Sequence, residues 1–222
     1  MAKLPNYLCV FDLETTDKIA ETCQPIQMAF KMYDYYSLDE VPNGEFSTLC
    51  RPPEGTYFSP EAMAVHKIPM EAIQKAPNIK LAWQSFVEEV QKYNPSKSKY
   101  NSPVVAGYNI EGYDLKIVDR LNKLCYGDKP PVLFNDFRGA VDLMKIIQLL
   151  FDTSGELGDV KFDTVRKYFG ISDSQAHLAN MDIRHEGALL VRMLKFLRQT
   201  TRNSTRKFKN AFKDFDFGTV TY

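Results

Sequence analysis

The sequence lacks an excess of either charge, a pairing pattern of cysteines and a long apolar run. Lysine plus arginine and aspartate plus glutamate both number 28, so net charge provides no global attraction to nucleic acid or to a membrane. The four cysteines are widely spaced without a C-x-x-C pair, which argues against a zinc knuckle and a disulfide framework. The richest apolar segment, Val141 to Phe151, is interrupted by Asp142 and Lys145, and the N-terminus has no signal-peptide core. These absences predict an intracellular protein of the cytoplasm or another reducing compartment, with no membrane association.

Residue content and pattern predict one α/β domain followed by a short tail. A hydrophobic content of 44% in 222 residues is ordinary for a globular protein. Runs of strand-forming residues over 7–11, 26–36 and 45–50 have short connections, which predicts three neighbouring antiparallel strands. Strands and helices alternate after residue 104, so we expect a mixed sheet. The domain is assigned to residues 1–198 and the tail to residues 199–222.

Capping residues and apolar spacing predict the helices. Ser59 followed by Pro60 fits the first turn of a short helix, and residues 79–93 have helical spacing. Residues 104–106 predict a buried strand, and residues 130–134 lead into another short strand. The remaining helices are expected over residues 115–124, from Asp142 through Leu150, from Asp163 to Gly170, and over 183–197.

Two acidic residues follow the first predicted strand and suggest a metal site. Asp12 and Glu14 are two residues apart, so both side chains project from the same face and can bind one ion. Hydrolysis of a phosphodiester needs an activated water and neutralised phosphoryl charge, which two divalent cations about 4 Å apart supply. Hard cations such as magnesium prefer oxygen ligands. A D-x-E triplet alone is nevertheless too common to identify a site.

Three further residues complete the pattern. Asp114 and Asp182 each begin a predicted helix, where the helix dipole favours a carboxylate, and each alone is only a helix cap. His177 lies five residues before Asp182 in a polar loop, where a neutral imidazole can take a proton from the attacking water. The interpretation as one site therefore depends on the order of these residues along the chain.

The three segments together resemble the DEDDh exonucleases, also called the DnaQ-like family. Members of this family carry D-x-E-T-T, then N-x-x-x-x-D after a strand, then H-x-x-x-x-D at the last helix. The corresponding segments here are Asp12 to Thr16, Asn109 to Asp114 and His177 to Asp182. The similarity extends to residues 59–68 and 162–171, so it covers most of the chain between residues 7 and 197.

The resemblance implies an α/β ribonuclease H-like fold with a mixed five-stranded sheet flanked by helices. It also implies two divalent metal ions, Mg²⁺ or Mn²⁺. By analogy, Asp12, Glu14 and Asp182 hold the first metal, Asp12 also holds the second, and Asp114 supports the second directly or through water. His177 is then the general base, and a histidine in place of a tyrosine is typical of the DEDDh branch.

The resemblance also implies contacts to the terminal nucleotide. In the family, backbone and side chains near the first segment and residue 66 hold this nucleotide, with a hydrophobic wedge beneath its base. The matching residues are Leu13, Thr15, Phe58 and His66. Plain core packing is the preferred role of Phe58, whereas the specific segment match favours substrate contact for His66. Asn109 either binds a phosphate or fixes its own loop.

Four residues depart from the family pattern. Asp17 and Lys67 replace common glycines, Tyr108 replaces a usual histidine, and Tyr113 replaces a usual phenylalanine. None of them is one of the five metal and base positions, so catalysis is still expected. Asp17 and Lys67 lie where the terminal nucleotide would enter, so substrate preference is expected to depend on them.

The C-terminal segment changes from basic to acidic. Between Arg192 and Lys213 there are eight lysines or arginines and no acidic residue, with three phenylalanines interleaved. This composition suits single-stranded nucleic acid, but a cationic helix end whose phenylalanines pack on the body is the simpler and preferred explanation. Residues 214–222 are acidic and aromatic, which suits either a docking peptide for a replication or repair partner or a self-packed strand.

The combined pattern predicts a metal-dependent 3'-to-5' exonuclease. We expect it to hydrolyse phosphodiester bonds at the free 3' end of single-stranded or frayed DNA or RNA and to release nucleoside 5'-monophosphates. One alternative is a non-catalytic nucleic-acid-binding or replication-associated subunit that retains the fold, and another is a structural protein whose carboxylates are caps. Both are disfavoured because all five functional positions are filled in order. The pattern does not select between DNA and RNA.

Overall fold

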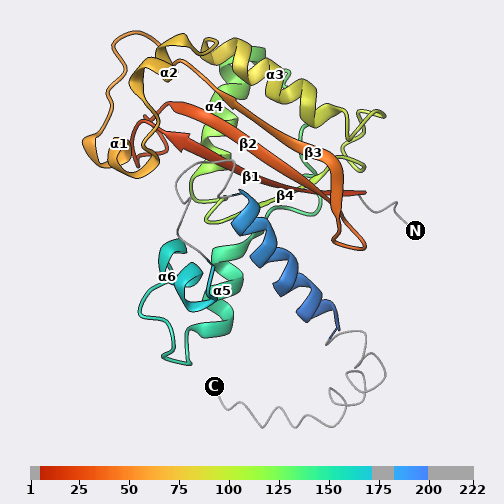
Figure 1. Cartoon of the computed structure of the whole chain (residues 1–222). Helices are drawn as coiled ribbons and strands as arrows, with labels where there is room; N and C mark the ends of the chain where they lie inside the picture. Colours follow the sequence, from red (N-terminus) through yellow and green to blue (C-terminus); the bar gives the residue numbers. More distant parts are fainter. Residues whose placement is uncertain (1–5, 172–182, 200–222) are drawn as a thin grey trace, which may run out of the picture. The chain divides into compact units, whose positions relative to one another are not determined.

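A five-stranded mixed sheet is the centre of the fold in the computed structural model, which describes residues 6–171 and 183–199 (Figure 1). Strands β1 (Tyr7–Thr15), β2 (Pro25–Asp34) and β3 (Glu40–Leu49) are antiparallel neighbours. Strand β4 (Val104–Gly107) runs parallel to β1, and β5 (Val141–Asp142) runs parallel to β4. The sheet order is β3-β2-β1-β4-β5. The predicted antiparallel start and mixed five-stranded sheet are therefore confirmed.

The predicted helices fall close to their expected positions, and one further short helix, over residues 70–75, was not predicted. Those with defined bounds are α1 (Pro60–His66), α2 (Met70–Lys75), α3 (Ile79–Gln91), α4 (Asp114–Tyr126), α5 (Leu143–Phe151) and α6 (Phe162–Tyr168). Residues 183–199 are also helical. The chain divides into two compact units, residues 1–187 and 188–222, and the sheet with α1 to α6 belongs to the first.

Capping side chains explain where two of these helices begin. The Ser59 hydroxyl accepts a hydrogen bond from the amide of Ala62, and Pro60 occupies the first turn of α1 as predicted. The Asn78 side chain accepts from the amide of Leu81 at the start of α3. Each cap satisfies an amide that has no partner within its own helix.

The short strand that residues 130–134 were expected to lead into begins only at Val141 and is two residues long. Residues 130–134 are not in a strand, and only Val141 and Asp142 pair with β4. Two consecutive prolines, Pro130 and Pro131, lack the amide hydrogens that a ladder requires. Asp142 then caps α5, because its carboxylate accepts from the amide of Met144.

Side chains of β1 and β2 alternate between the two faces of the sheet. One face, which carries Phe11 and Phe30, packs against α3 and α4 in the main hydrophobic core (Figure 1). The helical members of this core are Ile79, Ala82, Trp83, Phe86, Val87, Val90, Ile117, Val118 and Leu121. Asp12 and Glu14 alternate with Phe11 and Leu13 along β1, so the two carboxylates point to the other face.

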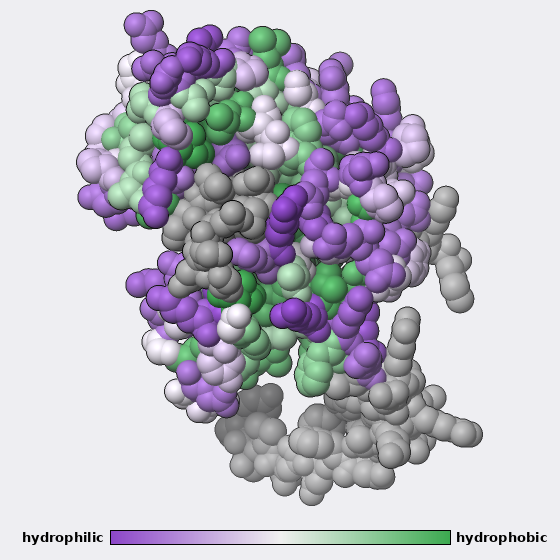
Figure 2. Space-filling model, viewed as in Figure 1, coloured by the Kyte–Doolittle hydropathy of each residue, from purple (hydrophilic) through white to green (hydrophobic). Residues whose placement is uncertain are grey.

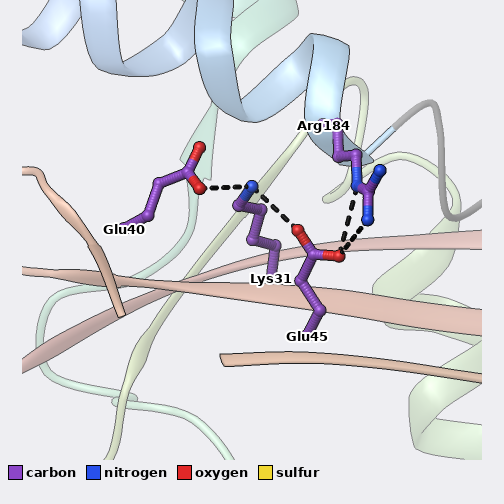
Figure 3. Close-up of polar contacts among 4 residues, drawn as sticks. All are labelled: Lys31, Glu40, Glu45 and Arg184. Carbon is purple, nitrogen blue, oxygen red and sulfur yellow. Dashed lines mark hydrogen bonds and ion pairs between the residues drawn. The ribbon is translucent and has the colours of Figure 1, made fainter. Parts of the chain in front are cut away.

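Charged side chains join residues 183–187 to that other face (Figure 3). Arg184 Nη2 donates to Glu45 Oε2 at 2.6 Å, and Lys31 Nζ lies 2.8 Å from Glu45 Oε1. Lys31 Nζ also lies 2.8 Å from Glu40 Oε2. The hydrogen bond from Arg184 holds the pKa of Glu45 below its usual range. The turn that directly follows residue 182 is therefore anchored to β2 and β3.

Gly187 lies in the first described turns of the helix over residues 183–199, and it allows this part of the helix to approach β2 closely. A β-carbon at residue 187 would lie 2.2 Å from the hydroxyl oxygen of Tyr33 and 2.9 Å from its ring carbon Cζ. Tyr33 is only 2% exposed, so moving its ring aside would disturb the side chains packed around it. The glycine is therefore required by packing.

Three features of the structure can be compared with the sequence composition: the hydropathy of the surface, the state of the cysteines and the character of the helices. On the face shown in Figure 2, hydrophilic side chains cover much of the surface, with smaller hydrophobic patches between them. Cys9, Cys23 and Cys50 are buried and Cys125 is half-buried, and all four are free thiols as predicted. None of the described helices combines the length and apolar character needed to cross a membrane.

Candidate active site

A cavity of about 550 Å³ opens at the C-terminal end of β1. Its wall comes from the end of β1, from the loop that follows, from α1, and from the segment between β4 and α4. The lining residues are Asp12, Leu13, Glu14, Thr15, Asp17, Lys18, Ser59, Glu61, Ala62, Val65, His66, Tyr108, Asn109, Tyr113 and Asp114. The structure thus brings the first two predicted segments, about 100 residues apart in sequence, to one cavity.

Three of the predicted metal-binding carboxylates influence one another electrostatically. Asp114 is 4% exposed at the first position of α4. Burial raises its pKa well above the usual range, and the charge of Asp12 adds to this effect, with a smaller contribution from Glu14. Asp12 and Glu14 are half-buried, and like charges held close together in such a wall favour either protonation or a bound cation.

The donor set fits an oxygen-ligated cation. Asp114 Oδ1 is buried and has no hydrogen-bond partner among the described residues, so neither of its lone pairs accepts a hydrogen bond from that part of the chain. Carboxylate oxygens are what Mg²⁺ and Mn²⁺ prefer. Within the described ranges, no three acidic, histidine or cysteine side chains are close enough to form a metal site by themselves. Asp182, the fourth predicted ligand, lies outside those ranges, as does His177.

Asp142 holds the loop that contains Asn109 in place. The sequence predicted Asp142 only as the start of a helix. Asp142 is 5% exposed, and its Oδ1 accepts hydrogen bonds from the amides of Asn109 and Met144, each at 3.0 Å. Asn109 has a left-handed backbone with φ of 54°, which asparagine tolerates better than most residues. One buried carboxylate therefore both caps α5 and fixes the loop that leads to Asp114.

Tyr113 connects the two predicted segments through its hydroxyl group. The hydroxyl oxygen lies 2.6 Å from Thr15 Oγ1 and donates to the carbonyl oxygen of Asp17 at 2.5 Å. The Thr15 hydroxyl donates to the same carbonyl at 2.8 Å. A phenylalanine, which is usual in the family at residue 113, could not make these bonds. The loop that carries Asp17 and Lys18 into the cavity wall is thereby tied to the start of α4.

His66 has a defined tautomer. Its Nδ1 accepts a hydrogen bond from the amide of Ile68 at 3.0 Å, so the proton of the neutral ring is on Nε2. Nε2 is buried and has no hydrogen-bond partner in the described part of the chain. Burial lowers the pKa of His66, which favours this neutral form. His66 can therefore offer one N–H donor to a ligand in the cavity that it lines.

The other predicted substrate residues divide into two groups. Leu13, Thr15 and Asn109 line the cavity with His66. Phe58 does not; it packs beside Ile26, Ile68 and Ile73, and it lines a separate hollow of about 520 Å³.

Asp17 and Lys67, which stand where glycine is common in the family, differ in their position relative to the cavity. Asp17 lines the cavity, whereas Lys67 is the C-terminal cap of α1, with a left-handed φ of 54°. A glycine adopts that conformation without steric cost, which explains why glycine suits residue 67.

Solved structures share this architecture, although no family model matches the sequence. Cell-death related nuclease 4 (CRN-4) superposes on 86% of the chain with a TM-score of 0.68 and 20% identity. Exonuclease I of E. coli in complex with a dT13 oligonucleotide superposes on 93%, with a TM-score of 0.69 and 17% identity. The nuclease domain of 3'hExo, a DEDDh family member bound to rAMP, superposes on 88%, with a TM-score of 0.65 and 15% identity. The chain has the DnaQ-like exonuclease fold.

The DnaQ-like fold spans different fractions of these proteins. The chain covers 64% of CRN-4, 43% of exonuclease I and 94% of the 3'hExo nuclease domain. The predicted ribonuclease H-like class is confirmed. At these identities the similarity establishes the DnaQ-like fold, and activity has to be argued from the residues of the site.

Proposed function

We propose that this protein is a metal-dependent 3'-to-5' exonuclease that releases nucleoside 5'-monophosphates from single-stranded or frayed ends. The observation that carries the proposal is the cavity that gathers Asp12, Glu14 and Asp114 within a DnaQ-like fold. A buried carboxylate is costly to a fold unless it is paired, protonated or bound to a cation. Asp114 is buried, Asp12 and Glu14 are half-buried, and all three line one open cavity, which favours a site that binds a cation for a reaction.

Asp12, Glu14, Asp114 and Asp182 are proposed to hold two divalent cations. When bound, these ions neutralise charge on the phosphoryl oxygens and assist the attacking water and the departing 3' oxygen. Asp114 Oδ1, which has no partner among the described residues, is the atom of α4 best suited to this role. Asp142 and the start of α4 would keep that carboxylate in position when substrate enters.

The remaining residues are proposed to bind and orient the end of the strand. His177 would take the proton of the attacking water. Leu13 and Thr15 would contact the terminal nucleotide from β1, and His66 would donate a hydrogen bond through Nε2. The solved structures of exonuclease I with dT13 and of 3'hExo with rAMP show that this fold can accept DNA in one protein and a ribonucleotide in another. DNA and RNA are therefore both proposed substrates.

An assay of end-labelled strands tests the proposed function. Single-stranded DNA and RNA carrying a 5' label should shorten stepwise from the 3' end in Mg²⁺ or Mn²⁺, and they should stay intact in chelator. Strands with a blocked 3' end should resist, and duplexes should be degraded slowly from frayed ends. Cleavage within the strand, or absence of metal-dependent cleavage of every strand, would contradict the proposal.

His66→Gln should raise KM more than it lowers kcat. Glutamine retains a side-chain N–H donor but cannot place it where the imidazole, fixed by Ile68, places Nε2. Loss of one hydrogen bond to substrate corresponds to about 1 kcal/mol, or roughly five-fold in KM. Steady-state kinetics with a short single strand checks this. A drop in kcat with unchanged KM would instead assign His66 to the chemical step.

A further inference from the structure

Two exposed aromatic rings form a stacked pair on a surface remote from the cavity. Tyr100 and Phe137 are 51% and 59% exposed, yet their ring centroids are 4.5 Å apart with an interplanar angle of 23°. Lys99 Nζ lies 5.6 Å from the Tyr100 centroid and 5.1 Å from the Phe137 centroid. Two large rings exposed side by side form a contiguous apolar patch, which is typical of an interaction site, whereas a single exposed ring is not.

A buried asparagine holds the pair in this arrangement. Asn135 is 4% exposed, and its Nδ2 donates to the carbonyl oxygen of Tyr100 at 3.0 Å. Its amide donates to the carbonyl oxygen of Pro103, and its Oδ1 accepts from the amide of Arg138. The bonds fix the backbones of both loops, so the two rings are preorganised before any ligand binds.

The surface around the rings is basic. Residues 95–103 and 135–139 contain Lys97, Lys99 and Arg138 but only one acidic residue, Asp136. All four of these charged residues are exposed. None of the three cations forms an ion pair with another residue of the described segments. Their charges are therefore available to a phosphate backbone.

The aromatic pair and the cavity lie at opposite ends of the sheet. β4 begins beside Leu8, near the start of β1, and the loop that precedes β4 lies at that end (Figure 1). The cavity is at the other end of β1, and the four residues of β4 alone span about 13 Å. A ligand that contacts both must be a strand of several nucleotides.

We propose that Tyr100, Phe137 and Lys99 form a platform that binds single-stranded nucleic acid away from the cleaved end. Bases stack on the two rings, and Lys97, Lys99 and Arg138 contact phosphates. Such binding is tolerant of sequence, because every base has a face that can stack. The platform deepens the proposed nuclease function: it would retain long strands between successive cleavages.

Direct binding tests the platform independently of cleavage. Fluorescence anisotropy of a labelled single strand about 20 nucleotides long is measured with the full chain in chelator, so that no hydrolysis occurs. The double variant Tyr100→Ser/Phe137→Ser should raise Kd roughly 5- to 100-fold. Lys99→Gln should raise Kd less and reduce the salt dependence of binding. Binding of a dinucleotide should not change, because it cannot reach from the cavity to the rings.

A second exposed aromatic pair provides a matched control. Tyr36 has the same 51% exposure as Tyr100 and packs edge-on against Tyr35. Tyr36→Ser should therefore leave Kd unchanged. Equal Kd values for the wild type and the double variant, at equal thermal midpoints, would contradict the proposed platform. The aromatic pair would then only hold the two loops together or contact another protein. An inactive protein whose strand binding still depends on the pair would contradict the nuclease proposal and retain the platform.

Discussion

Asp12→Asn should abolish nucleotide release and leave the protein folded. The substitution keeps the shape of the side chain but removes a charge that we propose binds both cations. Loss of several kcal/mol of charge stabilisation in the transition state corresponds to a decrease of roughly a thousand-fold or more in rate. The charge of Asp12 repels that of Asp114 and so adds to the effect of burial in raising the pKa of Asp114. Asparagine removes this repulsion, so the free energy of unfolding should not fall. Release of mononucleotides from a 3'-labelled strand and the thermal midpoint measure the two effects.

Asp119→Asn is the matched control for this experiment. Asp119 is exposed on α4, the same helix that begins with Asp114, and does not line the cavity. Its replacement should change neither activity nor the response to metal. Mn²⁺ should raise the thermal midpoint of the wild type and of Asp119→Asn, but much less that of Asp12→Asn. Substantial activity in Asp12→Asn, or loss of activity through unfolding, would remove the basis for the metal site.

The sequence was sufficient to predict the fold because local signals and the global pattern agree. β1 has an apolar run that ends at a D-x-E triplet, and α1 begins at a Ser-Pro cap, so both could be identified from short segments. The two-residue strand β5 could not be located, since two residues carry no periodicity. Its position depends on pairing with β4, which is a tertiary contact.

The same distinction applies to the candidate site. Asp12, Glu14 and Asp114 were identifiable because a metal site needs carboxylates and because the segments that carry them resemble those of the DEDDh exonucleases in type and order. Asp142 looked like an ordinary cap, and only the folded chain shows its second bond to Asn109. The stacking of Tyr100 on Phe137 joins residues 37 positions apart in two loops, and no sequence rule predicts such a pair. Positioning residues therefore required the structure, whereas the chemical groups did not.

Gly187→Ala should destabilise the protein, although alanine is normally the better helix residue. In an exposed helix this change stabilises by about 1 kcal/mol. Here the new β-carbon would lie 2.2 Å from the Tyr33 hydroxyl, and forcing an atom into a filled space costs about 1–3 kcal/mol or more. Because Tyr33 is 2% exposed, moving it aside would disturb the packing around it, and the steric cost should exceed the helical gain. Thermal or urea unfolding gives the sign directly.

A control and a partner substitution separate packing from other effects of Gly187→Ala. Gly158→Ala places a β-carbon where no atom lies within 4 Å, so its stability should change by less than about 0.5 kcal/mol. Tyr33→Leu removes the ring and should reduce the cost of Gly187→Ala, giving a coupling energy of at least about 0.5 kcal/mol. Residues 183–187 directly follow Asp182, so Gly187→Ala should also slow nucleotide release, and Tyr33→Leu should partly restore it. A stabilised Gly187→Ala protein with full activity would show that close approach of this turn to β2 is not required.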